Sequence, residues 1–246
     1  MASIERDRIS VGDLTAHVAR PVGAPTGAGM LLLPMVTGIG RQMREYADDV
    51  AAVGVTAVVW DPWHGHSDDD LSLQELVERM GGLVDAEVRA EQRRLLDHMS
   101  GRMGLRRVGV MGWCMGGRFA LLLAAHDGRL ANCVAYHPTV FAEPAPNQTE
   151  DAVALAERIT APVSVVYPGG DHLVPREVID ALSAALLRRE GASTLLSVHP
   201  GADHGFMDAS RQEREPNRLA KRDSWPATLA FVRATLQSGA QVPAQA

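Results

Sequence analysis

The sequence predicts an α/β fold in which helices cover both faces of a doubly wound, mostly parallel β-sheet. Short apolar runs alternate with helical patterns along most of the chain, which is typical of this fold class. The short runs are almost continuously apolar rather than alternating, as expected for strands that are buried on both faces. A length of 246 residues suits one domain of this kind.

The apolar runs predict six strands, which we place at residues 30–33, 56–60, 107–111, 132–136, 163–167 and 194–198. Helical patterns occupy the intervening segments, at residues 42–53, 73–99, 118–125, 178–189 and 225–236, and Gly81-Gly82 could divide the longest. The opening segment, residues 8–20, could form an antiparallel hairpin at one edge. We treat residues 1–237 as a single domain and expect residues 238–246 to form a frayed tail.

Composition and charge exclude several classes of function. A net charge of −6 without any Lys/Arg run argues against nucleic acid as a partner. No stretch approaches the roughly 18 apolar residues of a membrane helix, and the first residues lack the apolar run of a signal peptide. The two cysteines have neither Cys-x-x-Cys nor zinc-site spacing, which suits a reducing compartment. We therefore expect a cytoplasmic protein without a membrane partner.

The segment Gly112-Trp113-Cys114-Met115-Gly116-Gly117 joins a predicted strand to a predicted helix. Gly-x-nucleophile-x-Gly in this setting is the nucleophile elbow of α/β-hydrolases, so the predicted fold is an α/β-hydrolase fold. The turn requires glycines beside a strained central residue, and it points the Cys114 sulfur at a helix N-terminus that favours thiolate. Cys133 lies inside an apolar strand, and we interpret it as a buried core residue.

A thiol nucleophile needs a base, and the α/β-hydrolase order is nucleophile, acid, histidine. Asp171 and His204 follow successive predicted strands in that order. Both therefore belong to the carboxyl edge of the sheet, where Cys114 also lies. We predict His204 as the base and Asp171 as the carboxylate that orients its ring. Asp203 adjoins the histidine and is poorly placed to reach the ring, so it could brace the loop instead.

We expect the remaining site residues to surround Cys114, His204 and Asp171. Two backbone amides should hold the oxyanion, and we assign them to Met115 and Val36. The His-x-His pair in Trp63-His64-Gly65-His66 lacks an evident third ligand, so we predict no metal. The same turn could line an apolar pocket together with other aromatic residues. The predicted substrate-binding residues are Met35, Trp63, His64, Trp113 and Phe206.

The chain resembles the dienelactone hydrolase family. The resemblance rests on the elbow at 112–117, on Gly169-Gly170-Asp171-His172-Leu173-Val174-Pro175 and on Gly201-Ala202-Asp203-His204-Gly205-Phe206, and it covers about residues 29–236. It implies a cytoplasmic hydrolase of enol-lactones or related esters that uses a Cys-His-Asp triad and needs no cofactor.

Two positions depart from the family pattern. Met35 stands where many members carry a glutamate that interacts with the resting thiol. Asp208 lies near the position expected for an arginine that binds the substrate carboxylate, while Arg79 and Arg211 are other candidates for such a role. These departures favour neutral, moderately hydrophobic substrates over acidic ones.

The sequence therefore predicts a cysteine-dependent hydrolase of small esters or lactones, monomeric or homodimeric, that works through a covalent acyl-enzyme. Transfer of the acyl group to an acceptor other than water is a related alternative. A non-hydrolytic ligand-binding or thiol-sensing protein on the same fold is an alternative of a different class, because a fold does not guarantee an activity.

Overall fold

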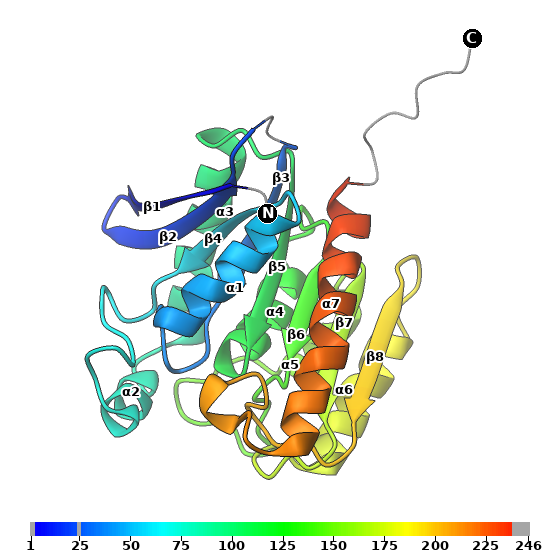
Figure 1. Ribbon diagram of the computed structural model, residues 1–246. Helices are drawn as coiled ribbons and strands as arrows, with labels where there is room; N and C mark the ends of the chain where they lie inside the picture. The colour runs from blue at the N-terminus through cyan, green and yellow to red at the C-terminus, as the bar shows by residue number, and fades with distance from the viewer. Residues whose placement is uncertain (1–2, 24–25, 238–246) are drawn as a thin grey trace.

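A single eight-stranded sheet forms the centre of the structure. The computed structural model describes residues 3–23 and 26–237. Within them, the strands pair in the order β1-β2-β4-β3-β5-β6-β7-β8 (Figure 1). Strands β3 to β8 are parallel, and the β1–β2 hairpin joins β4 in antiparallel orientation. The strands are β1 (Ile4–Val11), β2 (Leu14–Pro21), β3 (Ala28–Leu33), β4 (Thr56–Trp60), β5 (Arg107–Trp113), β6 (Cys133–Tyr136), β7 (Val163–Pro168) and β8 (Thr194–His199).

The predicted mostly parallel, doubly wound sheet is confirmed, and the six predicted strands correspond to β3 through β8. The opening segment forms the antiparallel edge hairpin. Strand β8 differs from the expectation of burial on both faces, because it is the other edge of the sheet and exposes Leu195 and Val198. The frayed tail expected at residues 238–246 lies outside the described residues, and the assignment of one domain to residues 1–237 stays a prediction.

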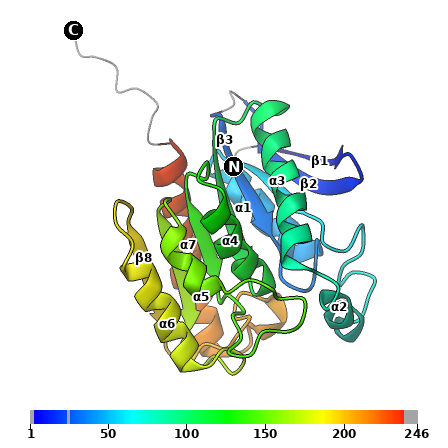
Figure 2. The ribbon, with the colours of Figure 1, turned by 180° about the vertical axis from the view of Figure 1, so that it is seen from behind.

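Helices cover both faces of the sheet (Figures 1 and 2). One face is covered by α1 and α7, and the other by α3, α4 and α6. No helix in residues 3–23 and 26–237 combines the length and apolar character needed to cross a membrane. The helices are α1 (Arg41–Ala52), α2 (Leu73–Met80), α3 (Asp85–Gly101), α4 (Met115–His126), α5 (Ala152–Leu155), α6 (Arg176–Leu187) and α7 (Glu215–Gln237), with 3₁₀ turns η1 (Ala156–Arg158) and η2 (Ala209–Arg211).

Two helices differ from their predicted bounds. The long pattern at residues 73–99 is two helices, because α2 ends at Met80 and the chain passes through Gly81 and Gly82 before α3. Helix α7 begins ten residues before the predicted start at Trp225 and continues through Pro226. Its first buried positions are small or polar (Asn217, Ala220, Ser224), so hydropathy alone does not reveal this part of the helix.

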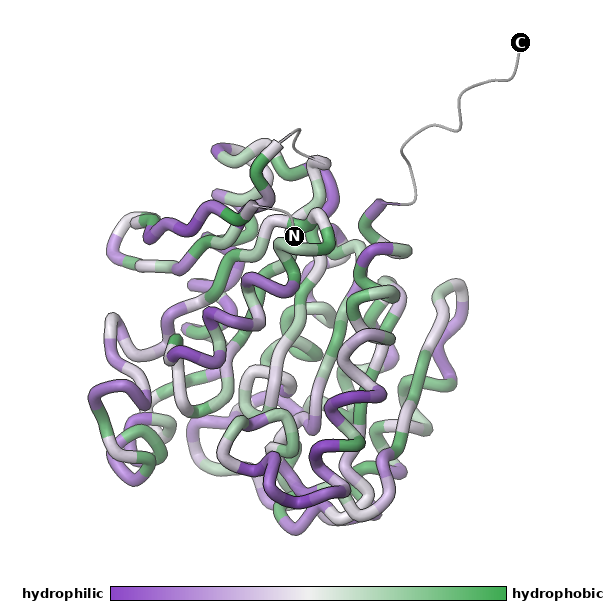
Figure 3. Tube along the Cα trace, in the orientation of Figure 1, coloured by the Kyte–Doolittle hydropathy of each residue, from purple (hydrophilic) through white to green (hydrophobic). Residues whose placement is uncertain are grey.

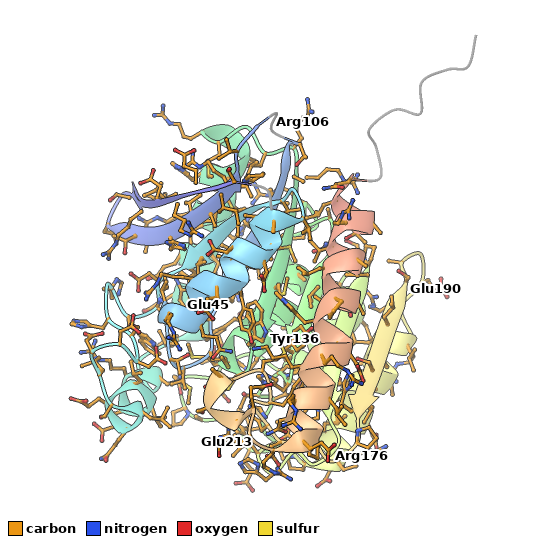
Figure 4. The ribbon with its side chains drawn as sticks, in the orientation of Figure 1. Glu45, Arg106, Tyr136, Arg176, Glu190 and Glu213 are labelled. Carbon is orange, nitrogen blue, oxygen red and sulfur yellow. The ribbon has the colours of Figure 1, made fainter. Side chains whose placement is uncertain are left out.

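The sheet separates two apolar cores. Figure 3 shows hydrophobic residues concentrated in the central strands and hydrophilic residues on the outer faces of the helices. Strand β5 contributes Val110 to the core under α3, α4 and α6, and Met111 and Trp113 to the core under α1 and α7. Tyr136 of β6 belongs to the latter core and lies near the middle of the molecule, whereas Glu45 lies on the outer side of α1 (Figure 4).

A buried ion pair links α3 to the helix that follows the elbow. Arg118 of α4 donates to both carboxylate oxygens of Asp85 at 2.5 and 2.8 Å, and both side chains are almost fully buried. The same pair binds the backbone of Glu150, whose N–H donates to Asp85 and whose carbonyl accepts from Arg118. The pair therefore fixes the loop after β6 to α3 and α4 at the carboxyl edge.

Replacing Asp85 by Ala should lower the free energy of unfolding by about 3–5 kcal/mol, because the charge of Arg118 would remain buried without a partner. Urea denaturation measures this change. The matched control is Asp180→Ala, which breaks an exposed pair with Arg176 and should lower stability by less than about 1 kcal/mol. Equal effects of the two substitutions on the free energy of unfolding would contradict a stabilising role for the buried pair of Asp85 and Arg118.

Candidate active site

Cys114 connects β5 to α4 through a single residue in an unusual backbone conformation. Its φ is 55° and its ψ is −118°, in a region that residues with a side chain rarely occupy. The flanking glycines allow a close approach of backbone segments. A Cβ at Gly112 would lie 2.0 Å from the Gly116 carbonyl oxygen, and one at Gly116 would lie 2.1 Å from the Leu33 carbonyl oxygen. The predicted elbow is therefore present, and its glycines fit the backbones of α4 and β3.

The Cys114 sulfur has two polar side-chain neighbours. The Nε2 atom of His204 lies 3.3 Å from Sγ, and the Oγ1 atom of Thr139 lies 3.0 Å from it. The residue is partly exposed, whereas Cys133 is buried. Cys114 therefore lies at the boundary between the surface and the interior, while Thr139 and His204 are buried.

His204 is held from its other side by Asp171. Its Nδ1 atom lies 2.9 Å from Oδ2 and 3.1 Å from Oδ1 of this carboxylate. Oδ1 also accepts hydrogen bonds from the backbone N–H groups of Leu173 and Val174, at 2.9 and 3.1 Å. Both side chains of the pair are almost completely buried. The structure thus brings together the three predicted residues, with the imidazole between the thiol and the carboxylate.

These contacts shift the pKa values of all three groups. Burial alone would raise the pKa of the Cys114 thiol, but the hydrogen bond and charge of His204 hold it below its ordinary value. Burial would lower the pKa of His204, but the hydrogen bonds to Asp171 and Cys114 raise it to about 9. Burial would raise the pKa of Asp171, but the hydrogen bond and charge of His204 and the backbone N–H groups of Leu173 and Val174 together lower it. All three directions favour a thiolate–imidazolium pair supported by a carboxylate.

The loop that carries His204 is fixed by neighbouring segments. Asn217 of α7 accepts a hydrogen bond from the backbone N–H of Asp203 at 2.8 Å and donates to its carboxylate at 3.2 Å. The Tyr46 hydroxyl of α1 donates to the Met207 carbonyl at 2.6 Å. Asp203 therefore braces the loop rather than orienting the His204 ring, as the sequence suggested.

The loop after β3 approaches the elbow from the other side. The indole N–H of Trp63 donates to the carbonyl of Val36 at 2.8 Å, and the N–H of Gly38 donates to the carbonyl of Met35 at 3.0 Å. These bonds fix the backbone of this loop. The assignment of the Val36 and Met115 amides to an oxyanion hole stays a prediction, because amides alone do not identify their acceptor.

The predicted pocket residues are placed differently from the expectation. The Trp113 ring is fully buried in the core under α1 and α7, stacked on Tyr46 with ring centroids 5.3 Å apart, so it is a packing residue rather than a pocket wall. Met35 and Phe206 belong to the same core, and Trp63 is also buried. His64 is exposed on its turn, with a positive φ of 52°.

The His-x-His pair of the turn at residues 63–66 does not form part of a metal site in the described part of the chain. Among residues 3–23 and 26–237, no group of three or more His, Cys, Asp or Glu side chains is arranged to hold an ion. His66 of the His-x-His pair instead contacts Asp70, with Nδ1 2.5 Å from Oδ2.

The structure adds two residues that the sequence analysis missed, His137 and Thr139. Both follow β6, so they end a strand at the same edge as Asp171 and His204, and that position could have indicated them. The buried ring of His137 lies 4.9 Å from that of His204, centroid to centroid. Burial, followed by the charge of His204, holds the pKa of His137 well below its ordinary value. His137 is therefore a neutral neighbour of the pair.

Comparison with known proteins gives consistent matches over nearly the whole chain. A model of the dienelactone hydrolase family matches residues 14–236. The carboxymethylenebutenolidase of Rhodococcus opacus is 26% identical over 239 residues, which cover 96% of this chain and 93% of that protein.

Solved structures share the same fold. A crystal structure from Klebsiella pneumoniae aligns with a TM-score of 0.81 and 24% identity, over 94% of this chain and 98% of the other. A dienelactone hydrolase-like promiscuous phosphotriesterase from metagenomic libraries aligns with a TM-score of 0.76 and 21% identity, over 96% and 99% of the two chains.

The two cysteines should differ strongly in reactivity toward iodoacetamide at neutral pH. Burial raises the pKa of Cys133 to about 12, whereas the pKa of Cys114 is lowered and the residue is partly exposed. Because the thiolate is the reactive form, Cys114 should be alkylated at least about 100-fold faster. Mass spectrometry of partially labelled protein measures the ratio at each site. Preferential labelling of Cys133 would contradict the environment described for Cys114.

Proposed function

The chain belongs to the dienelactone hydrolase family of hydrolases, and we propose that it cleaves small esters or lactones through a covalent acyl-enzyme on Cys114. The observation that carries this proposal is the chain of contacts from Cys114 through His204 to Asp171 on a nucleophile elbow. A thiol, a base and an orienting carboxylate in this arrangement are what nucleophilic acyl transfer requires.

In the proposed reaction, the Cys114 thiolate attacks the carbonyl carbon and His204 carries the proton released by the thiol. The backbone amides of Met115 and Val36 stabilise the oxyanion. His204 then protonates the leaving alcohol, or the ring oxygen of a lactone, as the thioester forms. Water attacks the thioester with His204 as general base, which releases the acid and restores the resting site. Asp171 remains ionised and keeps Nδ1 protonated throughout.

A screen of small esters and lactones against matched variants tests this mechanism. Cys114→Ala should abolish turnover, and Asp171→Asn should lower kcat by about 10²–10⁴-fold, because it removes the carboxylate that supports the base. Cys133→Ala is the control and should keep wild-type kinetics. Turnover that survives Cys114→Ala would overturn the proposed nucleophile. Reversible oxidation of Cys114 without turnover of any ester would instead favour a thiol sensor.

Neutral, moderately hydrophobic substrates should be preferred over acidic analogues of the same size. No Arg or Lys side chain within the described residues bonds to Cys114 or His204, and Arg211 near the histidine loop is exposed. An acidic substrate would therefore find no cation bonded to the nucleophile or the base, and its kcat/KM should be lower by at least about tenfold. Steady-state kinetics on a neutral ester and its carboxylate analogue measure the ratio.

Two variants identify the groups responsible for this preference. The carboxylate of Asp208 accepts a hydrogen bond from the Ser210 N–H at the start of η2. Asn can keep that cap, so Asp208→Asn removes the negative charge alone and should improve only the acidic analogue. If the wild type prefers the acidic analogue and Arg211→Gln loses that preference, Arg211 binds a substrate carboxylate. The predicted preference for neutral substrates would then be wrong.

A further inference from the structure

We infer that Thr139 is a further catalytic residue, whose hydroxyl bridges the Cys114 sulfur and the His204 imidazole and stabilises the resting thiolate. Its Oγ1 atom lies 3.0 Å from Sγ and 3.4 Å from Nε2, while Sγ and Nε2 are 3.3 Å apart. The three atoms therefore form a closed triangle of polar contacts. The inference rests on the proposed function in taking Cys114 as the nucleophile.

The backbone holds Thr139 in this position. Its N–H donates to the carbonyl of Cys114 at 3.1 Å, so the backbone and the side chain of Thr139 both bind the same residue. The N–H of Cys114 in turn donates to the carbonyl of Tyr136 at 3.1 Å. Thr139 is almost fully buried, and its β-branched side chain has few rotamers. The hydroxyl is therefore fixed beside the sulfur before any substrate arrives.

The hydrogen-bonding capacity of a hydroxyl explains which protonation state it favours. A hydroxyl has one proton to donate and lone pairs that accept. In the charged pair, the proton of the thiol resides on Nε2 of His204, the hydroxyl donates to the negative sulfur, and it accepts from the Nε2–H of the imidazolium. In the neutral pair, the hydroxyl can donate only to an uncharged acceptor, either the thiol sulfur or the unprotonated Nε2 atom of His204. Because bonds to charged groups are stronger, Thr139 favours the thiolate–imidazolium pair.

Few other side chains in the described part of the chain are placed to stabilise the Cys114 thiolate. His204 is the only titratable side chain there that bonds directly to the sulfur, with Asp171 behind it and the neutral, buried His137 beside it. No carboxylate and no Arg or Lys side chain of these residues forms a hydrogen bond or ion pair with Cys114. The neutral hydroxyl is therefore the second side-chain donor to the thiolate, after the imidazolium.

Thr139→Val is the direct test, because valine keeps the shape and removes the hydroxyl. Alkylation of Cys114 by iodoacetamide, followed by mass spectrometry between about pH 4 and pH 10, reports the apparent pKa of the thiol and its reactivity. Loss of a hydrogen bond to a thiolate should raise that pKa by about one unit. Nucleophilicity rises with pKa with a Brønsted coefficient of about 0.4–0.5, so the plateau rate at high pH should rise about threefold. At pH values below the thiol pKa of both proteins, the alkylation rate of Thr139→Val should be about 3–4-fold lower than that of the wild type.

The expected result is therefore that the two pH profiles cross, which a structural defect would not produce. Thr139→Ser should restore the wild-type profile, and Thr139→Ala should repeat the crossing if the valine variant folds poorly. Thr228→Val is the matched control, since it removes a buried hydroxyl that bonds to Tyr136 at 2.7 Å in the core under α1 and α7. It should leave the alkylation profile unchanged.

A uniform fall in rate at all pH values, or an unchanged profile in folded Thr139→Val, would overturn the inference. Alkylation requires no ester, so this result is independent of the proposed hydrolysis. Crossed profiles in a protein that hydrolyses no ester would retain the role of Thr139 in activating the thiol and reject the proposed function. Ester hydrolysis with profiles that do not cross would retain the proposed function and reject the role of Thr139.

Discussion

The left-handed backbone of Cys114 is the constraint on which the rest of the site depends. A residue with a side chain in this conformation is strained by about 1–3 kcal/mol, so surrounding contacts must hold it. They come from three directions: the Cys114 N–H bonds to the carbonyl of Tyr136, its carbonyl accepts from Thr139 and Arg118, and the Gly116 backbone packs on β3. These same contacts bring the loops after β3 and β6 to the sulfur. The geometry that strains the nucleophile therefore also assembles its neighbours.

Burial explains why one imidazole can hold two anionic groups in place. His204 is only 4% exposed, so its bonds to the thiolate and the carboxylate are weakly screened by water. Each partner raises the pKa of the ring, and together they outweigh the desolvation that alone would lower it. The neighbouring His137 cannot compete for this proton, because it is buried with neither ring nitrogen hydrogen-bonded to another described residue. The site thus concentrates its positive charge on the one ring that touches the sulfur.

The sequence predicted the elbow and its partners because their signals are local. The motif at 112–117 and the polar residues after successive strands can be read without knowing how the strands pack. The face of the sheet on which the Trp113 side chain lies could not be predicted in the same way. Both faces of β5 are apolar, so the alternation that distinguishes an inner from an outer face is hidden. Only the packed structure shows that Met111 and Trp113 face α1 and α7 while Val110 faces α4.

Other omissions have similar physical causes. Thr139 is an ordinary loop residue in sequence, and its importance depends on a backbone bond to Cys114, which lies between β5 and α4. Hydropathy does not indicate the first half of α7, because its buried side chains are small or polar, and one of them, Asn217, bonds to the histidine loop. In each case the decisive information is a tertiary contact, which hydrophobic periodicity does not encode.

The long sequence separations within the site have a consequence for folding. His204 and Cys114 are 90 residues apart, and His204 follows β8, the exposed edge strand of the sheet. Contacts between residues so far apart in the sequence form only when the intervening strands have assembled. Segments with few buried apolar contacts open most readily in local unfolding, and most residues of β8 are partly or fully exposed. A transient detachment of β8 that also broke the bonds of the histidine loop to Asn217 and Tyr46 would withdraw the imidazole and leave Cys114 as an ordinary thiol. Any such opening would couple the acidity of this sulfur to the β7–β8 pairing, so that the charge state of a residue between β5 and α4 would depend on a strand at the edge of the sheet.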